Sequence, residues 1–217
     1  MLRCGDVWNN GNRSFAYIHV ASNLKNEFKH IYHRFENIPE KGFFVLNEFK
    51  SEINKPTLDS IIQSDLLNEK YFSTEEQNKE TQRQLEQLTS YAKMVGAYKV
   101  GENEQIELYG PILKDKLLSS DFIEMDFKSY LIKIQSYIME WTDENWNNLV
   151  EGFQELHQKA LAELKNKSAE KRTYYFLDAE RIDKEKLYEV NWYDYFFTVI
   201  STLENSDDLL IMNFGND

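Results

Sequence analysis

Two long helical stripes followed by a β-rich tail constrain the fold of this chain more than any other feature. Apolar side chains recur three and four residues apart from Phe127 to Trp141, and again from Trp146 to Leu164, which is the spacing of one buried helix face. Thr142 lies between the two stripes as a candidate N-cap. So short a connection predicts a bend or an antiparallel pair of helices.

Three later segments, 173–177, 193–202 and 208–214, are rich in aromatic and β-branched residues, which favours strands. The sequence therefore predicts an α+β fold in which several amphipathic helices pack on a small, mostly antiparallel sheet with a C-terminal β meander. The sequence has no internal repeat and no low-complexity tract, which excludes solenoids and propellers.

The first part of the chain predicts strands and helices in alternation. Residues 14–20 and 43–46 have the pattern of strands. Pro56 begins a predicted helix whose apolar residues are Leu58, Ile61, Ile62 and Leu66. An earlier helix is predicted from residue 22 to Pro39 and Gly42, with the stripe Leu24, Phe28, Ile31, Tyr32 and Phe35.

The segment 74–95 predicts a projecting helix or a partly flexible linker, because its first turns contain nothing apolar until Leu85. We therefore expect one domain, 1–217, or two closely packed parts, 1–72 and 85–217, joined by a polar helical segment, 73–84. Gly101 lies in a four-residue connection that predicts a hairpin between 97–100 and 105–109, and Pro111 then begins another helical stretch.

Charge and composition limit the classes of partner. The 217 residues are 41% hydrophobic, which is enough for a proper core, and carry a formal charge of −12. That negative field would repel phosphate backbones and anionic membranes, so nucleic acid is a poor partner. One cysteine, the absence of a hydrophobic leader in 1–20 and the absence of a long apolar run predict a cytoplasmic protein without membrane spans.

Motifs that carry chemistry are missing from the sequence. The glycines form no phosphate-binding loop and no serine elbow is present, so no cofactor is predicted. The best candidates for metal ligands are Glu27, His30 and His33. On the predicted helix, however, Glu27 and His33 would lie about 120° apart around the axis. No metal site is therefore predicted. His157 lies at the edge of an apolar stripe. This position favours a hydrogen-bonded histidine at the boundary of the core over a catalytic base.

The strongest functional signal is a tail in which acids and large aromatic side chains are interleaved. Residues 173–217 contain ten acidic residues against three basic ones. Aromatic anchors beside carboxylates suit a surface that captures a basic partner. The alternative is that the aromatics are core residues and the acids keep strand edges solvated. The predicted partner-binding residues are Asp178, Glu180, Asp183, Tyr188, Glu189, Trp192, Tyr193, Asp194, Asp207 and Asp208.

An acidic chain without catalytic motifs that ends in YYFLDAERID, EVNWYDYFFTVIST and DDLLIMNFGND resembles the immunity proteins of bacterial toxin and immunity pairs. The resemblance implies binding to a cognate toxin delivered by a type VI or contact-dependent system, with occlusion of the toxin's active site. In a toxin with a basic cleft, the acidic side chains of the immunity protein would bind in the cleft and imitate the charge of phosphate.

Two other functions remain open from the sequence. The chain could be a hydrolase-like enzyme that uses paired carboxylates or His157 in a pocket between the long helices and the sheet. It could also be an adaptor that docks a partner through the helix predicted over 74–95.

Overall fold

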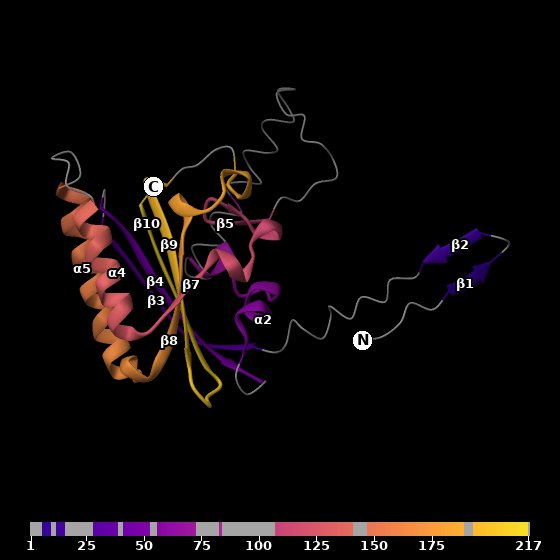
Figure 1. The fold of residues 1–217 in the computed structure, drawn as a ribbon, viewed down its shortest axis with the longest axis horizontal. Coiled ribbons are helices and arrows are strands. Elements are labelled where there is room, and N and C mark those ends of the chain that lie inside the picture. Colours follow the sequence, from indigo (N-terminus) through magenta and orange to yellow (C-terminus); the bar gives the residue numbers. More distant parts are fainter. Residues whose placement is uncertain are drawn as a thin grey trace, which may run out of the picture.

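A six-stranded antiparallel sheet organises the protein, with the strand order β3-β4-β10-β9-β8-β7 (Figure 1). The structure is a computed structural model, and it describes residues 6–9, 12–15, 28–38, 41–52, 56–72, 83, 107–140, 147–188 and 193–216. The strands of this sheet are β3 (Phe28–Ile38), β4 (Gly42–Ser51), β7 (Ile123–Met125), β8 (Arg172–Asp178), β9 (Tyr195–Leu203) and β10 (Asp208–Asn216). The α+β class and the C-terminal meander, β8 to β10, are confirmed.

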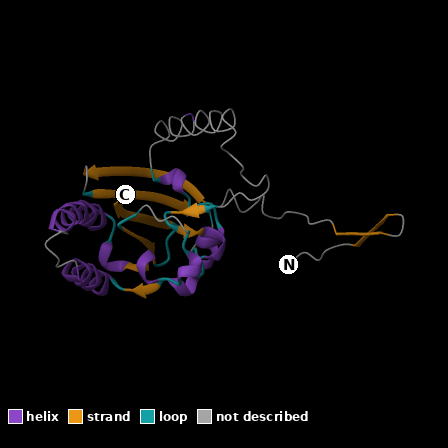
Figure 2. Ribbon diagram, turned by 90° about the horizontal axis from the view of Figure 1, so that it is seen from above, coloured by secondary structure: helices purple, strands orange, loops and turns teal. Residues whose placement is uncertain are grey.

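Helices cover the sheet on both sides. On one side lie α4 (Phe127–Glu140) and α5 (Asn147–Asn166), and on the other lie the short helix α2 (Leu58–Gln63) and the hairpin of β5 (Leu108–Tyr109) and β6 (Ile112–Leu113) (Figures 1 and 2). A second hairpin joins β1 (Asp6–Asn9) to β2 (Asn12–Phe15). The six-stranded sheet contains strands from both sides of the predicted 73–84 segment, since β3 and β4 precede it and β7 to β10 follow it.

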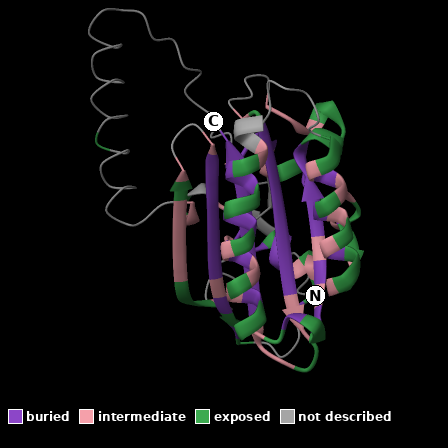
Figure 3. Cartoon of the chain, turned by 90° about the vertical axis from the view of Figure 1, so that its left-hand side faces the viewer, coloured by how far each residue is buried: buried purple, intermediate pink, exposed green. Residues whose placement is uncertain are grey.

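The helix side of the sheet is filled mainly by aromatic rings. Phe153 of α5 is fully buried, and its ring lies 5.5 Å from that of Phe197 on β9 and 5.8 Å from that of Phe214 on β10. Burying a phenylalanine contributes about 1.5–3 kcal/mol relative to leaving it in water. Figure 3 shows the result: the strands behind the helices are buried, and exposed residues gather on the outward faces of α4 and α5.

Arg172, at the start of β8, is a buried cation that joins three elements on the helix side. Its guanidinium donates hydrogen bonds to the backbone oxygens of Lys167 (3.3 Å), Ser201 (3.0 Å) and Asp208 (3.2 Å), and its Nε donates to Ser201 Oγ (2.9 Å). These four acceptors compensate for the loss of water around a side chain whose residue is only 4% exposed.

The opposite side of the sheet combines an apolar core with a buried polar group. Tyr109 packs edge-on against Phe196, and its hydroxyl donates to Asn213 Oδ1 at 2.5 Å. Thr198 Oγ1 lies within hydrogen-bond distance of both of these oxygens. Gly110 makes this packing possible: it has φ +57°, and a Cβ there would come within 2.6 Å of the Phe196 ring.

The sequences of β9 and β10 are almost continuous apolar runs because both faces of these strands are covered. Phe197 and Phe214 point to the helix side, while Phe196 and Ile211 belong to the core of the opposite side. Strands buried on both faces lose the alternation of polar and apolar residues that marks a half-exposed strand.

The helix predicted from residue 22 is wrong where the structure describes it, because Phe28–Ile38 is strand β3. The pairing of β3 with β4 shifts register between His30 and Tyr32. Such a β-bulge adds one residue and interrupts the two-residue period of a strand. The apolar spacing of the segment therefore imitates a helical stripe, although the chain is extended.

The other expectations can be placed segment by segment. The helices predicted at Pro56, Phe127 and Trp146 correspond to α2, α4 and α5, and the strands predicted at 43–46, 173–177, 193–202 and 208–214 correspond to β4, β8, β9 and β10. The helical stretch predicted from Pro111 is wrong, because Gly110 and Pro111 form the turn between β5 and β6. The 74–95 helix, residues 16–20, residues 97–100 and Thr142 lie outside the described residues, apart from residue 83.

Candidate functional sites

The predicted partner-binding residues divide between two ends of the sheet. Asp178 ends β8 opposite Phe197, near the start of β9, whereas Asp208 begins β10 opposite Lys50. The rise along a strand puts roughly 20 Å between these positions. Glu189 and Trp192 lie outside the described residues. The predicted residues therefore do not form one continuous surface.

Glu140, Asp178, Glu180 and Arg181 form a carboxylate cluster at the first of these ends. Asp178 is only 4% exposed, so it does not lie on the surface as the sequence suggested. Its Oδ1 accepts hydrogen bonds from Tyr137 Oη (3.4 Å) and from the backbone N of Glu180 (3.0 Å). Arg181 contacts Asp178 Oδ2 at 3.1 Å and Glu140 Oε2 at 2.5 Å. One guanidinium thus serves two of the three carboxylates.

The electrostatic environment of this cluster is unfavourable for its negative charges. Burial raises the pKa of Asp178, against the opposing effects of its hydrogen bond from Glu180 and the charge of Arg181. Burial also raises the pKa of Glu180, and the charges of Asp178 and Glu140 raise it further. Glu140 ends α4, whose last turn has no basic residue, and the helix dipole disfavours a carboxylate there. An added cation would relieve this repulsion.

Four other predicted residues lie at the same end of the sheet or in the chain that follows β8. Asp183 and Asp194 are exposed, and Tyr188 and Tyr193 are partly buried. Asp194 Oδ2 accepts a hydrogen bond from Asn216 Nδ2 (3.0 Å). The Tyr193 ring packs 5.2 Å from Phe196 and 6.2 Å from Phe43. Tyr193 is thus anchored in the core of the side opposite the helices.

The second end carries Asp207, the last residue of the connection between β9 and β10, and Asp208, the first residue of β10. Lys50 Nζ lies 3.3 Å from Asp207 Oδ1 and 3.4 Å from Asp208 Oδ1. These two carboxylates already share an intramolecular cation. They are less suited than Glu180 and Asp183 to the capture of a basic partner.

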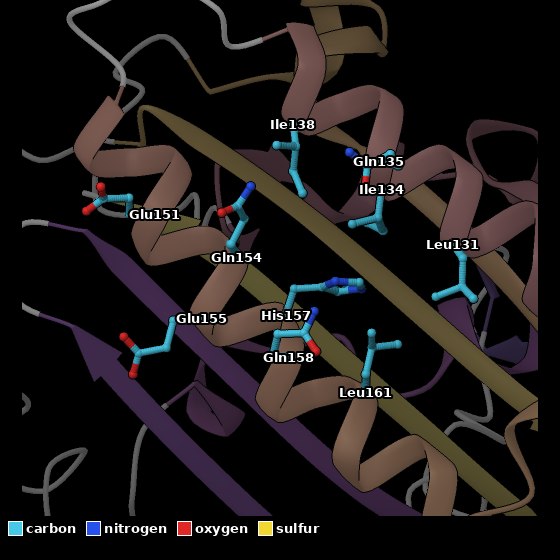
Figure 4. Close-up of a pocket in the computed structure, with 10 residues that line it drawn as sticks. All are labelled: Leu131, Ile134, Gln135, Ile138, Glu151, Gln154, Glu155, His157, Gln158 and Leu161. Atoms are coloured by element: carbon cyan, nitrogen blue, oxygen red, sulfur yellow. The ribbon is translucent and has the colours of Figure 1, made fainter.

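A groove of about 500 Å³ runs between α4 and α5 (Figure 4). Its walls combine aliphatic side chains, three glutamines, two glutamates and a histidine: Leu131, Ile134, Gln135, Ile138, Glu151, Gln154, Glu155, His157, Gln158 and Leu161. The two carboxylates have cationic neighbours, since Glu151 lies 3.4 Å from Lys41 Nζ and Glu155 lies 3.1 Å from Lys159 Nζ. The sequence placed an alternative active site between the long helices and the sheet, whereas the residues that line this groove come from α4 and α5 alone.

His157 extends from α5 toward α4 in this groove (Figure 4). It is 6% exposed, stacks on Phe153, and its Nε2 lies 3.1 Å from Tyr130 Oη. Burial lowers the pKa of His157 from 6.5 to about 4. The imidazole is therefore neutral at pH 7, and it is a weak general base because such catalysis is best with a pKa near the working pH.

His30 and His33 meet at Asn47, an arrangement that the sequence reasoning missed. The β-bulge places both imidazoles on the side of the sheet that carries Asn47. His30 Nε2 lies 3.0 Å and His33 Nδ1 2.8 Å from Asn47 Oδ1. The argument from sequence against a metal site assumes a helix, and it does not apply because residues 28–38 form a strand. Glu27 lies outside the described residues, and the described part contains no group of three or more His, Cys, Asp or Glu side chains suited to a metal ion.

Comparison with known proteins places this chain in no established group. No protein-family model, no curated protein and no solved structure matches it. Among the helices that the structure describes, none has both the length and the apolar character needed to cross a membrane.

Proposed function

We propose that the chain is an immunity protein that binds and neutralises a cognate toxin, and that the carboxylate cluster with Asp183 and Asp194 supplies the acidic part of its contact surface. The observation that carries the proposal is the sharing of Arg181 between Asp178 and Glu140, while Glu180 lies close enough for its pKa to be raised by both acids. A lysine or arginine of the partner would add further positive charge beside these carboxylates.

The physical role of the surface is capture followed by anchoring. Exposed carboxylates speed the encounter with a basic patch through electrostatic steering. Tyr193, which precedes Asp194 in the chain, is partly buried, and its ring packs against Phe43 and Phe196; tyrosine is enriched among residues that dominate binding energy. A toxin with a basic cleft would be blocked by acids that occupy the place of its anionic substrate.

The test begins with capture of the tagged chain and its partner from the native cells, followed by association kinetics with the purified partner. The double variant Glu180→Lys with Asp183→Lys should slow association about tenfold at low salt, with a smaller effect at high salt. Asp207→Lys with Asp208→Lys is the matched control, because it makes the same charge change at the other end of the sheet. Equal association rates for all three proteins would contradict the proposed surface.

A second candidate function is the binding or conversion of a small molecule in the groove between α4 and α5. It is favoured by the volume of the groove and by the neutral His157 within it. Ligand-observed NMR with a fragment library, repeated on Gln154→Ala with Gln158→Ala, would test this function. Fragments that lose binding in the variant would favour it over the immunity proposal. The adaptor function rests on the 74–95 helix and stays a prediction.

A further inference from the structure

Two imidazole nitrogens approach one amide oxygen at the junction of β3 and β4, at distances that a shared metal ion would also require. Nitrogen and oxygen ligands lie about 2.0–2.1 Å from a divalent ion such as Zn²⁺. Two ligands at right angles around the ion are then about 2.9 Å apart, and two tetrahedral ligands about 3.4 Å apart. The His30 Nε2 and His33 Nδ1 distances to Asn47 Oδ1, 3.0 and 2.8 Å, fit right angles.

We propose that His30 Nε2, His33 Nδ1 and Asn47 Oδ1 bind a divalent transition-metal ion that accepts ligands at right angles, such as Ni²⁺, with water in the other positions. Imidazole nitrogen is a preferred ligand of these ions. His30 is exposed, so water can reach the ion from that side. The proposal is independent of the toxin-binding function and of the carboxylate cluster.

The surroundings of the three donors fix them in place. Asn47 is 1% exposed, and its Nδ2 donates to the backbone oxygen of Tyr71 at 3.0 Å, which leaves Oδ1 directed at the two imidazoles. The His30 ring packs 4.9 Å from Phe49 and 5.2 Å from Tyr71. Contacts of this kind orient the ligands of a metal and are a regular part of its site. Asn47 is also a polar residue on a β4 face whose neighbouring positions are Val45 and Phe49.

Hydrogen bonding alone leaves His30 incompletely matched. Both Asn47 and the Tyr32 backbone raise the pKa of His30, as hydrogen-bond acceptors do. A neutral imidazole has only one N–H and cannot donate to both acceptors. With Nε2 on a metal ion, Nδ1–H is available for the Tyr32 backbone, which is a common partner of a metal-bound histidine.

The tautomer of His33 provides a direct spectroscopic signature. When Nδ1–H donates to Asn47, Nε2 carries a lone pair, and this atom is buried with no hydrogen-bond partner among the described residues. When Nδ1 binds a metal ion, the proton moves to Nε2. The imidazole ¹⁵N chemical shifts of His33 distinguish these two states, because each nitrogen changes its protonation.

The experiment titrates the full chain, first freed of metal with a chelator, with Ni²⁺ and with Zn²⁺. Calorimetry should give one site, and ¹⁵N NMR should show the change at His30 and His33. His30→Gln and His33→Gln should each weaken binding at least tenfold, as loss of a ligand requires. Asn47→Leu, which removes the oxygen and roughly keeps the size of the side chain, should weaken it as well. Lys29→Gln, on the same strand, should leave it unchanged and serves as the control.

Two results would overturn the metal site. One is equal metal affinity in the native chain and in His30→Gln and His33→Gln, each shown by circular dichroism to be folded. The other is unchanged imidazole ¹⁵N shifts at His30 and His33 while metal binds elsewhere. Unchanged metal affinity in a folded Asn47→Leu would show that Oδ1 is not a ligand and would also contradict the proposed donor set.

Discussion

The two sides of the central sheet are both buried, yet they are filled in different ways. On the helix side, two regular helices press aromatic rings such as Phe153 onto Phe197 and Phe214. On the opposite side, short irregular segments bring polar atoms into the interior, including the Tyr109 hydroxyl and the side chain of Asn213. Apart from the hydrogen-bonded Arg172, the first side depends mainly on volume and shape, whereas the second depends on hydrogen bonds that must be satisfied away from water.

This difference predicts which kind of substitution should destabilise each side. Loss of volume on the helix side leaves a cavity, since close-packed side chains relax only partly. Loss of one polar atom on the opposite side leaves its partner buried without a hydrogen bond. Three substitutions, taken from the largest expected effect to the smallest, test this comparison.

Phe153→Ala should have the largest effect, a loss of about 3–5 kcal/mol in the free energy of unfolding. Its ring contacts Tyr195, Phe197 and Phe214 and is fully buried, so nothing fills the space. Urea unfolding followed by circular dichroism measures this loss. Ile132→Ala, at a position 61% exposed on α4, is the control and should change stability by less than about 0.5 kcal/mol.

His157 should make the helix side sensitive to acid. Its pKa is lowered from 6.5 to about 4 in the folded protein, so between these values the unfolded chain binds more protons. Stability therefore falls as the pH falls from 6.5 toward 4, by about 3 kcal/mol in total. Urea unfolding at several pH values should give a shallower pH dependence for His157→Phe. Equal pH dependence in the two proteins would show that His157 is accessible to protons in the folded state.

Tyr109→Phe should cost about 1–2 kcal/mol, because the ring stays in place while Asn213 Oδ1 loses the hydroxyl that donates to it. The same urea measurement applies. Tyr32→Phe is the matched control, since Tyr32 is 39% exposed. A loss as large as that of Phe153→Ala would mean that the two sides do not differ in what stabilises them.

Regular, long elements could be predicted from the sequence, and irregular ones could not. The helices α4 and α5 repeat one apolar stripe over several turns, and β9 and β10 are dense in strand-forming residues, so local pattern and tertiary structure agree. The sequence of β3 predicts a helix because its bulge interrupts the two-residue period of apolar side chains that marks a strand. The β5 and β6 hairpin was missed because Gly110 and Pro111 resemble the start of a helix as well as a turn.

The candidate sites were harder to predict because they depend on pairing between distant segments. Asp178 and Asp208 are close in sequence, but Asp178 ends β8 and Asp208 begins β10, two strands that run in the same direction on either side of β9, so the two acids lie at opposite ends of the sheet. Asp178 lies in the interior since the alternation of β8 directs it to the helix side. The meeting of His30 and His33 at Asn47 requires the register of β3 on β4, which no local pattern in the sequence contains.

The strand order of the sheet also has a consequence for synthesis of the chain. β10 lies between β4 and β9, so both of these strands have an open, apolar edge until β10 leaves the ribosome. Open edges of this kind invite pairing with other chains, and contacts between residues so far apart in sequence form slowly. We therefore expect a nascent chain that ends before residue 208 to depend on a chaperone, although most of its sheet has already been made.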